Sequence, residues 1–148
     1  MTAATLRLDI VSAEKEIFSG EVESLFVTGE MGELGISPGH SQLLTSIRPG
    51  YVRAVLPGKA AEQEEVFYIS GGMLEVQPYI VSILADDAKR ADDIDETAAI
   101  AAKEQAEKAL AGKASAIDIA KATTEIAEIS AQIRAINQLK RRAKGGRG

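Results

Sequence analysis

The sequence predicts an all-β N-terminal domain over residues 1–85, folded as an antiparallel sandwich or barrel, followed by an α-helical hairpin over residues 86–148. All six aromatic residues and all four prolines lie in the first part, with nine of the thirteen glycines. There, apolar and polar residues alternate in short runs, the period of half-buried strands. The second part is rich in alanine, and its isoleucines recur every three or four residues, the period of an amphipathic helix.

Seven strands are expected in the first part, separated by residues typical of turns. They cover residues 6–10, 22–27, 43–47, 51–56, 65–70, 73–77 and 79–84. Turns are expected at Ser19-Gly20, from Gly29 to Gly39, and at Pro49-Gly50, Pro57-Gly58 and Gly71-Gly72. Many short strands without an intervening helix favour a sandwich or barrel and exclude a helix bundle here.

The second part is expected to form two helices. Asp92 or Asp93 is expected to cap the first, which starts near Ile94 and ends near Ala111, with Gly112 as its C-terminal cap. Residues 115–118 resemble a capping box that opens the second helix.

One face of the second helix carries a heptad stripe. The stripe consists of Ile119, Ala122, Ile126, Ile129, Ile133 and Ile136. The first helix is expected to oppose it with Ala98, Ala99, Ala102, Ala106, Ala109 and Leu110. Because an alanine buries only one methyl group, the attachment between the helices is expected to be modest. The pattern fits a purely structural hairpin, and it equally fits a helix that can dock elsewhere.

Charge is distributed unevenly along the chain. The net charge is −5, with −6 in residues 1–85 and +1 in residues 86–148. From Arg134 onward every charged residue is basic. This asymmetry indicates macromolecular partners. The chain has no cysteine, no apolar run of the roughly 20 residues that span a membrane, and no signal-like start, so an unexported soluble protein without membrane insertion is expected.

No motif for catalysis or cofactor binding emerges. The glycine-rich stretch 29–39 has no lysine and carries Glu30 and Glu33, which would repel a phosphate, so a nucleotide cradle is not expected. His40 is the only histidine, so neither a general base nor a zinc site is expected. The aspartates near residue 90 lack the glycine and distal glutamate of a calcium loop. No aromatic residue follows Tyr79, which disfavours nucleic acid as the partner of the basic end. We therefore expect no metal, no cofactor and no enzymatic activity of its own.

Several short motifs in fixed order resemble the epsilon subunit of bacterial F-type ATP synthase. These are LDIVS at residues 8–12, FSG at 18–20, GELGI at 32–36, PGH at 38–40, LLT at 43–45, SGGMLEVQP at 70–78 and LAD at 84–86. The resemblance extends from about residue 5 to residue 142. It implies a β-sandwich of about ten strands with a C-terminal helical hairpin. It also implies a rotor subunit in the central stalk, peripheral at the cytoplasmic face of the bacterial inner membrane, which couples the catalytic head to the proton-driven c ring.

The resemblance also implies partners for particular residues. A turn that faces the c ring corresponds to Glu30, Met31, Gly32, Glu33, Leu34 and Gly35. Contacts with the gamma subunit correspond to Ser12, His40 and Thr45. Contacts with the alpha and beta subunits, made by an extended hairpin that inhibits ATP hydrolysis, correspond to Arg134, Lys140, Arg141 and Arg142. A hairpin with a weak alanine seam suits such a change of position.

Two positions depart from the family pattern. Ser41-Gln42 stands where members commonly have Ala-Pro, which is expected to alter a strand edge only. Some members bind ATP through a motif reading Ile/Leu-Asp-x-x-Arg-Ala, and the corresponding residues here are Ile94, Asp95, Ala98 and Ala99. Alanine offers phosphate neither charge nor donors, so weak or absent ATP binding is expected, with Asp95 serving to start a helix. The alternative is a nucleotide-sensing module in which bound ATP holds the hairpin folded.

Overall fold

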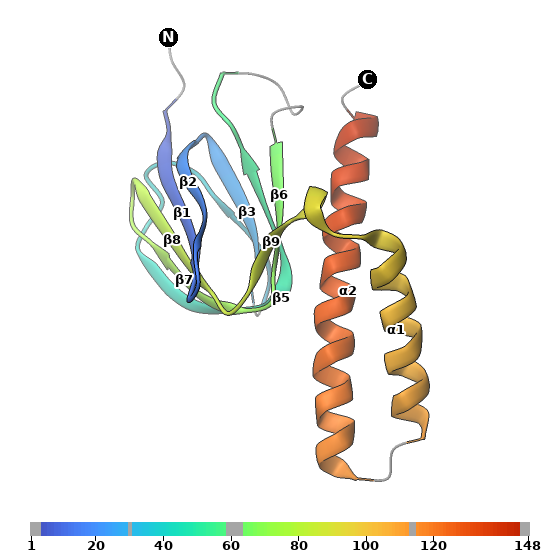
Figure 1. The fold of residues 1–148 in the computed structure, drawn as a ribbon. Coiled ribbons are helices and arrows are strands. Elements are labelled where there is room, and N and C mark those ends of the chain that lie inside the picture. The colour runs from blue at the N-terminus through green and yellow to red at the C-terminus, as the bar shows by residue number, and fades with distance from the viewer. Residues whose placement is uncertain (1–3, 30, 59–63, 113–114, 146–148) are drawn as a thin grey trace.

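The computed structural model describes residues 4–29, 31–58, 64–112 and 115–145, with side chains up to Arg141. A β-sandwich forms the N-terminal part and two antiparallel helices the C-terminal part, with the second helix against one face of the sandwich and the first helix on the far side of the second (Figure 1). The strands are β1 (Leu6–Ser12), β2 (Glu16–Val22), β3 (Ser24–Gly29), β4 (Gly32–Ile36), β5 (Leu43–Val55), β6 (Glu64–Ile69), β7 (Gly72–Val76), β8 (Ile80–Ala85) and β9 (Ala88–Arg90). A 3-10 turn, η2 (Ala91–Asp93), leads to α1 (Glu96–Ala111) and α2 (Ala116–Gly145).

The strands form two layers that share β5. In the first layer the order is β2-β1-β8-β7-β5, and in the second β4 pairs with β3, β3 with β5, β5 with β6 and β6 with β9. Residues 43–47 of β5 pair with β7, whereas residues 50–55 pair with β6. The pairing of β1 with β8 is parallel, and the other pairings of the described strands are antiparallel. The sandwich predicted by the sequence is thus confirmed, with one parallel pair and with nine strands in the described part.

Alternating side chains from both layers form the core between them. The burial pattern of β1 starts buried-exposed-buried, as a strand with one solvated face requires. The core contains eighteen buried residues from the sandwich strands, among them Leu8, Leu25, Phe67 and Ile83. No described α-helical residue belongs to this cluster, so the sandwich has a core of its own.

Two of the expected turns lie inside strands in the structure, and a third contains a strand between its turns. Ser19-Gly20 lies inside β2, where Ser19 pairs with Asp9 of β1. The stretch from Gly29 to Gly39 contains β4, which pairs with β3. Pro49-Gly50 lies inside β5, at the point where the strand passes from one layer to the other. Gly50 is needed there because a Cβ at this position would lie 2.5 Å from the Cβ of Thr28. The position therefore requires glycine because β3 and β5 approach each other closely, and not because the chain turns there.

The sheet continues beyond the composition break at residue 85. Strand β9 pairs with β6 through Phe67 and Arg90, Tyr68 and Lys89, and Ile69 and Ala88. Three residues with little apolar content give no strand pattern in the sequence, so β9 escaped prediction. The short β4 and, apart from Val22, β2 were also missed, because their glycines were interpreted as turn residues. The first α-helix begins only with Glu96.

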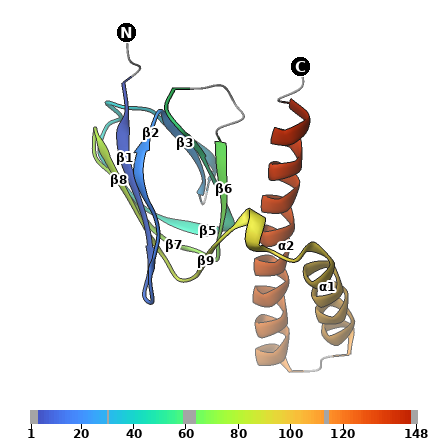
Figure 2. The ribbon, with the colours of Figure 1, turned by 45° about the horizontal axis from the view of Figure 1, so that its top comes forward.

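The first helix begins later than expected. Asp95, rather than Asp92 or Asp93, is its N-cap, and its carboxylate accepts a hydrogen bond of 3.1 Å from the backbone N–H of Ala98. Asp92 and Asp93 lie in η2, which turns the chain from the sheet towards the helices (Figure 2). At the other end Gly112 is the C-cap, as predicted. Ser115 accepts a hydrogen bond of 3.3 Å from the N–H of Asp118, which confirms the predicted start of α2.

The alanine seam between the helices is narrower than predicted. On α1 only Ala99 and Ala106 are buried, and Ala98, Ala102 and Ala109 are exposed. The α2 stripe is buried at Ala122, Ile129 and Ile136, but Ile119 at its start is exposed. A second apolar face of α2, formed by Ala131 and Ala135, is fully buried against the sandwich. Exposed alanines are common in helices because alanine has high helix propensity, so alanine content alone does not mark a contact face.

Candidate interaction surfaces

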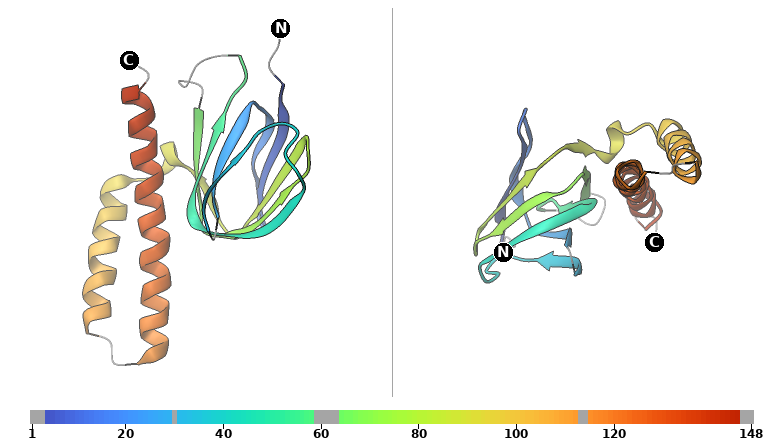
Figure 3. Two further views of the ribbon diagram at one scale, coloured as in Figure 1. Left: turned by 180° about the vertical axis from the view of Figure 1, so that it is seen from behind. Right: turned by 90° about the horizontal axis from the view of Figure 1, so that it is seen from below.

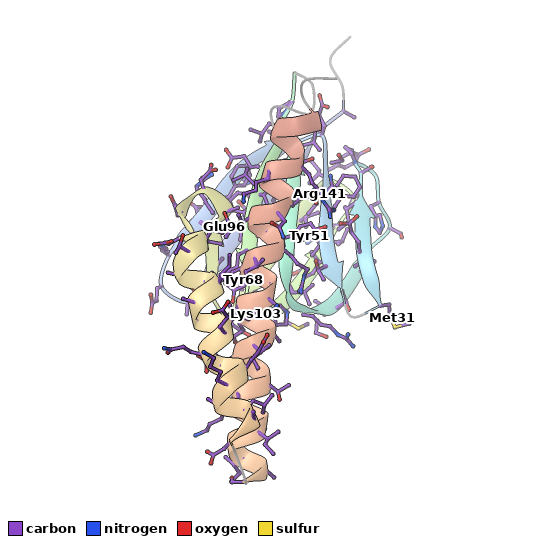
Figure 4. The ribbon with its side chains drawn as sticks, turned by 90° about the vertical axis from the view of Figure 1, so that its right-hand side faces the viewer. Met31, Tyr51, Tyr68, Glu96, Lys103 and Arg141 are labelled. Atoms are coloured by element: carbon purple, nitrogen blue, oxygen red, sulfur yellow. The ribbon has the colours of Figure 1, made fainter. Side chains whose placement is uncertain are left out.

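The β3–β4 turn is the most exposed part of the predicted docking segment. Met31 is 99% exposed, and Figure 4 shows it at the tip of the sandwich, away from the hairpin. Gly32 follows with a φ of +121°, a backbone conformation that suits glycine. Leu34 is half-buried and Gly35 exposed, while Glu30 lies outside the described residues. The turn therefore presents a large apolar side chain to solvent.

Glu33, beside this turn, belongs to a charged cluster on the outer face of the second layer. Its carboxylate lies 3.6 Å from the guanidinium of Arg53 and accepts a hydrogen bond of 3.3 Å from the hydroxyl of Tyr51. Arg53 also pairs with the buried Glu64 at 3.1 Å, and its guanidinium lies 4.2 Å from the centre of the Phe26 ring. Burial, and then the charge of Glu33, raise the pKa of the Tyr51 hydroxyl.

The three residues expected to contact gamma are not brought together. Ser12 pairs with Ala85, at the end of the first layer where β5 reaches Ile47. Thr45 pairs with Leu74, two residues before Ile47 in β5, and is partly buried. His40 lies near the opposite end of the strands. There the N–H of the adjacent Gly39 donates a hydrogen bond of 2.7 Å to the carbonyl of Pro78. The Nδ1 atom of the His40 ring lies 2.7 Å from the carbonyl oxygen of Ser41. An interface that includes all three must span the length of the strands.

The outer face of the first layer carries apolar side chains that the sequence patterns did not reveal. Met73 of β7 pairs with Leu84 of β8, and Leu84 pairs with Val11 of β1, so the three cross the sheet in one row. Leu44 of β5 lies diagonally from Met73 and is 68% exposed, and Leu84 is 58% exposed. We call Val11, Leu44, Met73 and Leu84 the apolar row.

Figure 3 shows that the layer with β1, β7 and β8 faces away from the helices. The sequence contains a signal for the apolar row, because residues 79–84 are apolar on both faces of the strand instead of alternating. Apolar side chains gathered on an exposed sheet face are typical of a protein–protein interface.

Helix α2 contacts the other face of the sandwich, through small residues. Ala131 and Ala135 are completely buried against Val66 and Tyr68. Burial raises the pKa of Tyr68 to about 12, and a hydrogen bond with the Gln132 side chain acts in the opposite direction. Because two methyl groups contribute little compared with leucine side chains, the contact is close but its apolar contribution is small.

The basic side chains near the end of α2 have partners within the chain. Arg134 donates a hydrogen bond of 3.3 Å to the carbonyl of Pro49 in β5. Lys140 forms an ion pair of 2.8 Å with Glu96 in the first turn of α1. Arg141 lies beside Tyr51, and its charge, like that of Arg53, partly offsets the rise in the pKa of that hydroxyl (Figure 4). The side chain of Arg142 lies outside the described part.

The residues at the expected nucleotide motif have helix-start roles. The Asp95 carboxylate is engaged as the N-cap, Ile94 packs against the cluster under α2, Ala98 is exposed and Ala99 is buried. Within the described ranges, no three His, Cys, Asp or Glu side chains gather in a way that could hold a metal ion. No helix in this part of the chain is long and apolar enough to cross a membrane.

Two family models together match most of the chain. Residues 5–91 match the ATP synthase delta/epsilon chain β-sandwich domain, and residues 92–137 match its long α-helix domain. The "ATP synthase epsilon chain" of Legionella pneumophila (strain Corby) is 54% identical over 140 residues, covering 95% of this chain and 98% of that one. The protein of the same description from Nitrosococcus oceani is 52% identical with the same coverage.

Solved structures share the fold. A chain of the Euglena gracilis mitochondrial ATP synthase superposes with a TM-score of 0.76 at 21% identity, covering 86% of this chain and 78% of that one. A chain from the central stalk and c-ring of the Tetrahymena thermophila enzyme gives a TM-score of 0.61 at 14% identity, covering 92% and 99%. At these identities the likeness concerns the fold alone. The sequence matches establish that the chain belongs to the ATP synthase delta/epsilon chain family, among its epsilon chains.

Proposed function

We propose that this chain is a non-catalytic rotor subunit that couples the catalytic head of ATP synthase to the c ring and inhibits ATP hydrolysis with its hairpin. One observation carries the proposal. The hairpin covers one face of the sandwich through a seam of alanines, while the opposite face carries the exposed apolar row. One face therefore suits a lasting interface and the other suits a contact that can be released.

The partners follow from these surfaces. The apolar row suits the gamma subunit, because an exposed apolar sheet face is stabilised when a partner covers it. Ser12 and Thr45 follow Val11 and Leu44 in the chain but pair with the core residues Ala85 and Leu74, so they would join that interface at the edge of the layer. His40 joins that interface if gamma spans the sheet from end to end. The β3–β4 turn, with the protruding Met31 and with Glu33 beside it, suits the loops of the c ring. In this position the protein is peripheral at the cytoplasmic face of the bacterial inner membrane.

The hairpin inhibits when it leaves the sandwich and extends towards the alpha and beta subunits. Arg134 is bound to Pro49 of β5 and becomes free to meet an acidic surface when α2 leaves the sandwich. Lys140 is paired with Glu96 of α1, so it becomes free only when the two helices also separate as the hairpin extends. Exposed ion pairs contribute about 0–1 kcal/mol each, and two conformations that differ by a few kcal/mol are both accessible. Several weak contacts can therefore decide the position of the hairpin.

Truncation of the hairpin in the assembled enzyme tests this proposal. The cut belongs after Asp93, because a cut after residue 85 would also remove β9 and leave the edge of β6 unpaired. We expect faster ATP hydrolysis with unchanged assembly. A shorter truncation after Gln138, which removes Lys140, Arg141 and Arg142, should give part of the effect. Unchanged hydrolysis in both truncated enzymes would show that the hairpin is structural only.

The nucleotide-sensing alternative has less support. In the docked hairpin the Asp95 carboxylate already accepts the N–H of Ala98, and Ala98 presents a methyl group where the ATP-binding motif has a guanidinium. A bound triphosphate would therefore find no guanidinium at this position to donate two hydrogen bonds to it.

A further inference from the structure

The charged cluster around Glu33 touches both the β3–β4 turn and the docked helix. Glu33 is the second residue of β4, directly after the turn, and its carboxylate reaches Tyr51 and Arg53 on β5. Arg53 is fixed on its other sides, by Glu64 and by the ring of Phe26. Because Arg53 cannot follow a displaced Glu33, the position of this carboxylate decides whether the cluster is closed.

Tyr51 connects this cluster to the hairpin. Its ring packs against the apolar cluster under α2 that contains Ala131 and Ala135, and Leu139 packs against the same cluster. Its hydroxyl donates to Glu33, and Arg141 approaches the same hydroxyl from α2 (Figure 4). The side chain therefore has one neighbour on the turn side and another on the helix side.

The charges explain how one side affects the other. Arg53 and Arg141 are both cationic, and the carboxylates near them are Glu33, half exposed, and Glu64, which is buried beside Arg53. Without Glu33, the charge of Arg53 is balanced by Glu64 alone, and the cluster that the cationic Arg141 faces becomes more positive by one charge. Glu33 in its observed position thus favours the docked end of α2.

We propose that Glu33, Tyr51 and Arg141 link the β3–β4 turn to the docked hairpin, so that a protein loop which draws Glu33 out of the cluster weakens the docking of α2. The identification of that loop with the c ring rests on the proposed function, whereas the link within the chain does not. Because coupling is reciprocal, a docked hairpin also lowers the affinity of the turn for such a partner.

The absence of cysteine from the chain gives a direct readout. The thiol of a Val66→Cys variant fits the space of the valine beneath α2 and reacts with an alkylating reagent only after the helix undocks, so its labelling rate measures the undocked fraction. We call this variant the docking reporter. The thiol of a Val76→Cys variant in the sandwich core reports opening of the sandwich itself, and we call that variant the core reporter. Both are measured in the isolated full chain, which contains no other subunit.

We expect Glu33→Gln and Arg141→Gln each to raise labelling of the docking reporter about two- to fivefold, the range of an exposed charge pair, without changing labelling of the core reporter. The double variant should exceed either single one by little, because each removes the same interaction. Glu75→Gln, a matched change on the opposite layer, should have no effect. An unchanged rate in Glu33→Gln, or fully multiplicative effects in the double variant, would overturn the link.

A second measurement adds the purified c ring in detergent to the docking reporter. Faster labelling with native Glu33 and no further acceleration in Glu33→Gln is the expected result. Absence of binding in a cosedimentation assay would instead contradict the assignment of the turn to the c ring, and the result with the isolated chain would still stand.

Discussion

The ammonium group of Lys140 lies 2.8 Å from the carboxylate of Glu96, and this ion pair joins the end of α2 to the first turn of α1. It closes the hairpin at the end opposite to the connection between the helices. Both side chains are partly exposed, so solvent screens the attraction. The same lysine is one of the residues proposed to meet the catalytic head, and it cannot serve both partners at once.

The first prediction concerns this pair. A double-mutant cycle with Lys140→Gln and Glu96→Gln should give a coupling free energy of about 0.2–1 kcal/mol at low salt, and less in concentrated salt. Urea unfolding of the four proteins measures it. A coupling that does not weaken with salt would argue against a solvent-exposed ion pair.

The second prediction concerns Ala135, which is fully buried between α2 and the sheet. Ala135→Leu adds three carbon atoms to a closed contact and should cost about 1–3 kcal/mol, which is enough to shift the hairpin towards release. The labelling rate of the docking reporter measures this shift. Ala127→Leu, the same change at an exposed position of the same helix, should leave the rate unchanged. Equal rates in the two variants would mean that the seam does not hold α2.

The third prediction follows from Tyr68. Its pKa is raised from 10.0 to about 12 while α2 covers it, so the docked state binds the phenolic proton more tightly than the undocked state. The resulting stabilisation is complete below pH 10 and is lost as the pH rises towards about 12. An ultraviolet titration of tyrosinate should therefore show a lower pKa for Tyr68 in the protein truncated after Asp93. Because Tyr51 also packs against the cluster under α2, the comparison is made in a Tyr51→Phe background. There Tyr68→Phe should abolish the difference, and its persistence would assign it to another tyrosine.

The fourth prediction tests Gly50. Its substitution by alanine would bring a Cβ to 2.5 Å from Thr28, so Gly50→Ala should destabilise the sandwich by about 1–3 kcal/mol. Gly112→Ala is the matched control, because its nearest neighbour would lie at 3.9 Å. Thermal unfolding compares the two. If Thr28→Gly restores stability in the double variant, the close approach is the cause.

The fifth prediction concerns ATP. Calorimetric titration of the isolated chain with Mg-ATP should show weak or no binding, and micromolar affinity would contradict the interpretation of Ala98. Ala98→Arg tests the same point from the other side. The position is exposed on α1, so the longer side chain is accommodated. Increased affinity in this variant would identify the missing guanidinium as the reason.

Local sequence patterns predicted the two-part fold well. Strands with strict alternation, such as β1, were recognised, and so was the C-terminal cap of α1, because each depends on near neighbours in the chain. Glycine and proline misled the prediction inside β2 and β5. At Gly50 the reason lies in a strand 22 positions earlier in the chain, where Thr28 leaves no room for a Cβ. Contacts of this range are invisible to local periodicity.

The surfaces were predicted less completely for the same reason. The motif resemblance led to Glu33, but its partners Tyr51 and Arg53 come from another strand. The apolar row required the pairing register of β7 and β8, which places Met73 opposite Leu84. Burial of Ala131 and Ala135 against the sheet depends on how α2 is rotated, which its heptad stripe towards α1 does not determine.

The single strand β5, which pairs with β7 in one layer and with β6 in the other, has a consequence for cooperativity. Neither layer can lose its order without releasing half of a strand that the other layer needs. The sandwich should therefore melt as one unit in calorimetry. The hairpin, which shares no strand with it and adjoins it through small side chains, can lose its place at lower free energy as a separate unit.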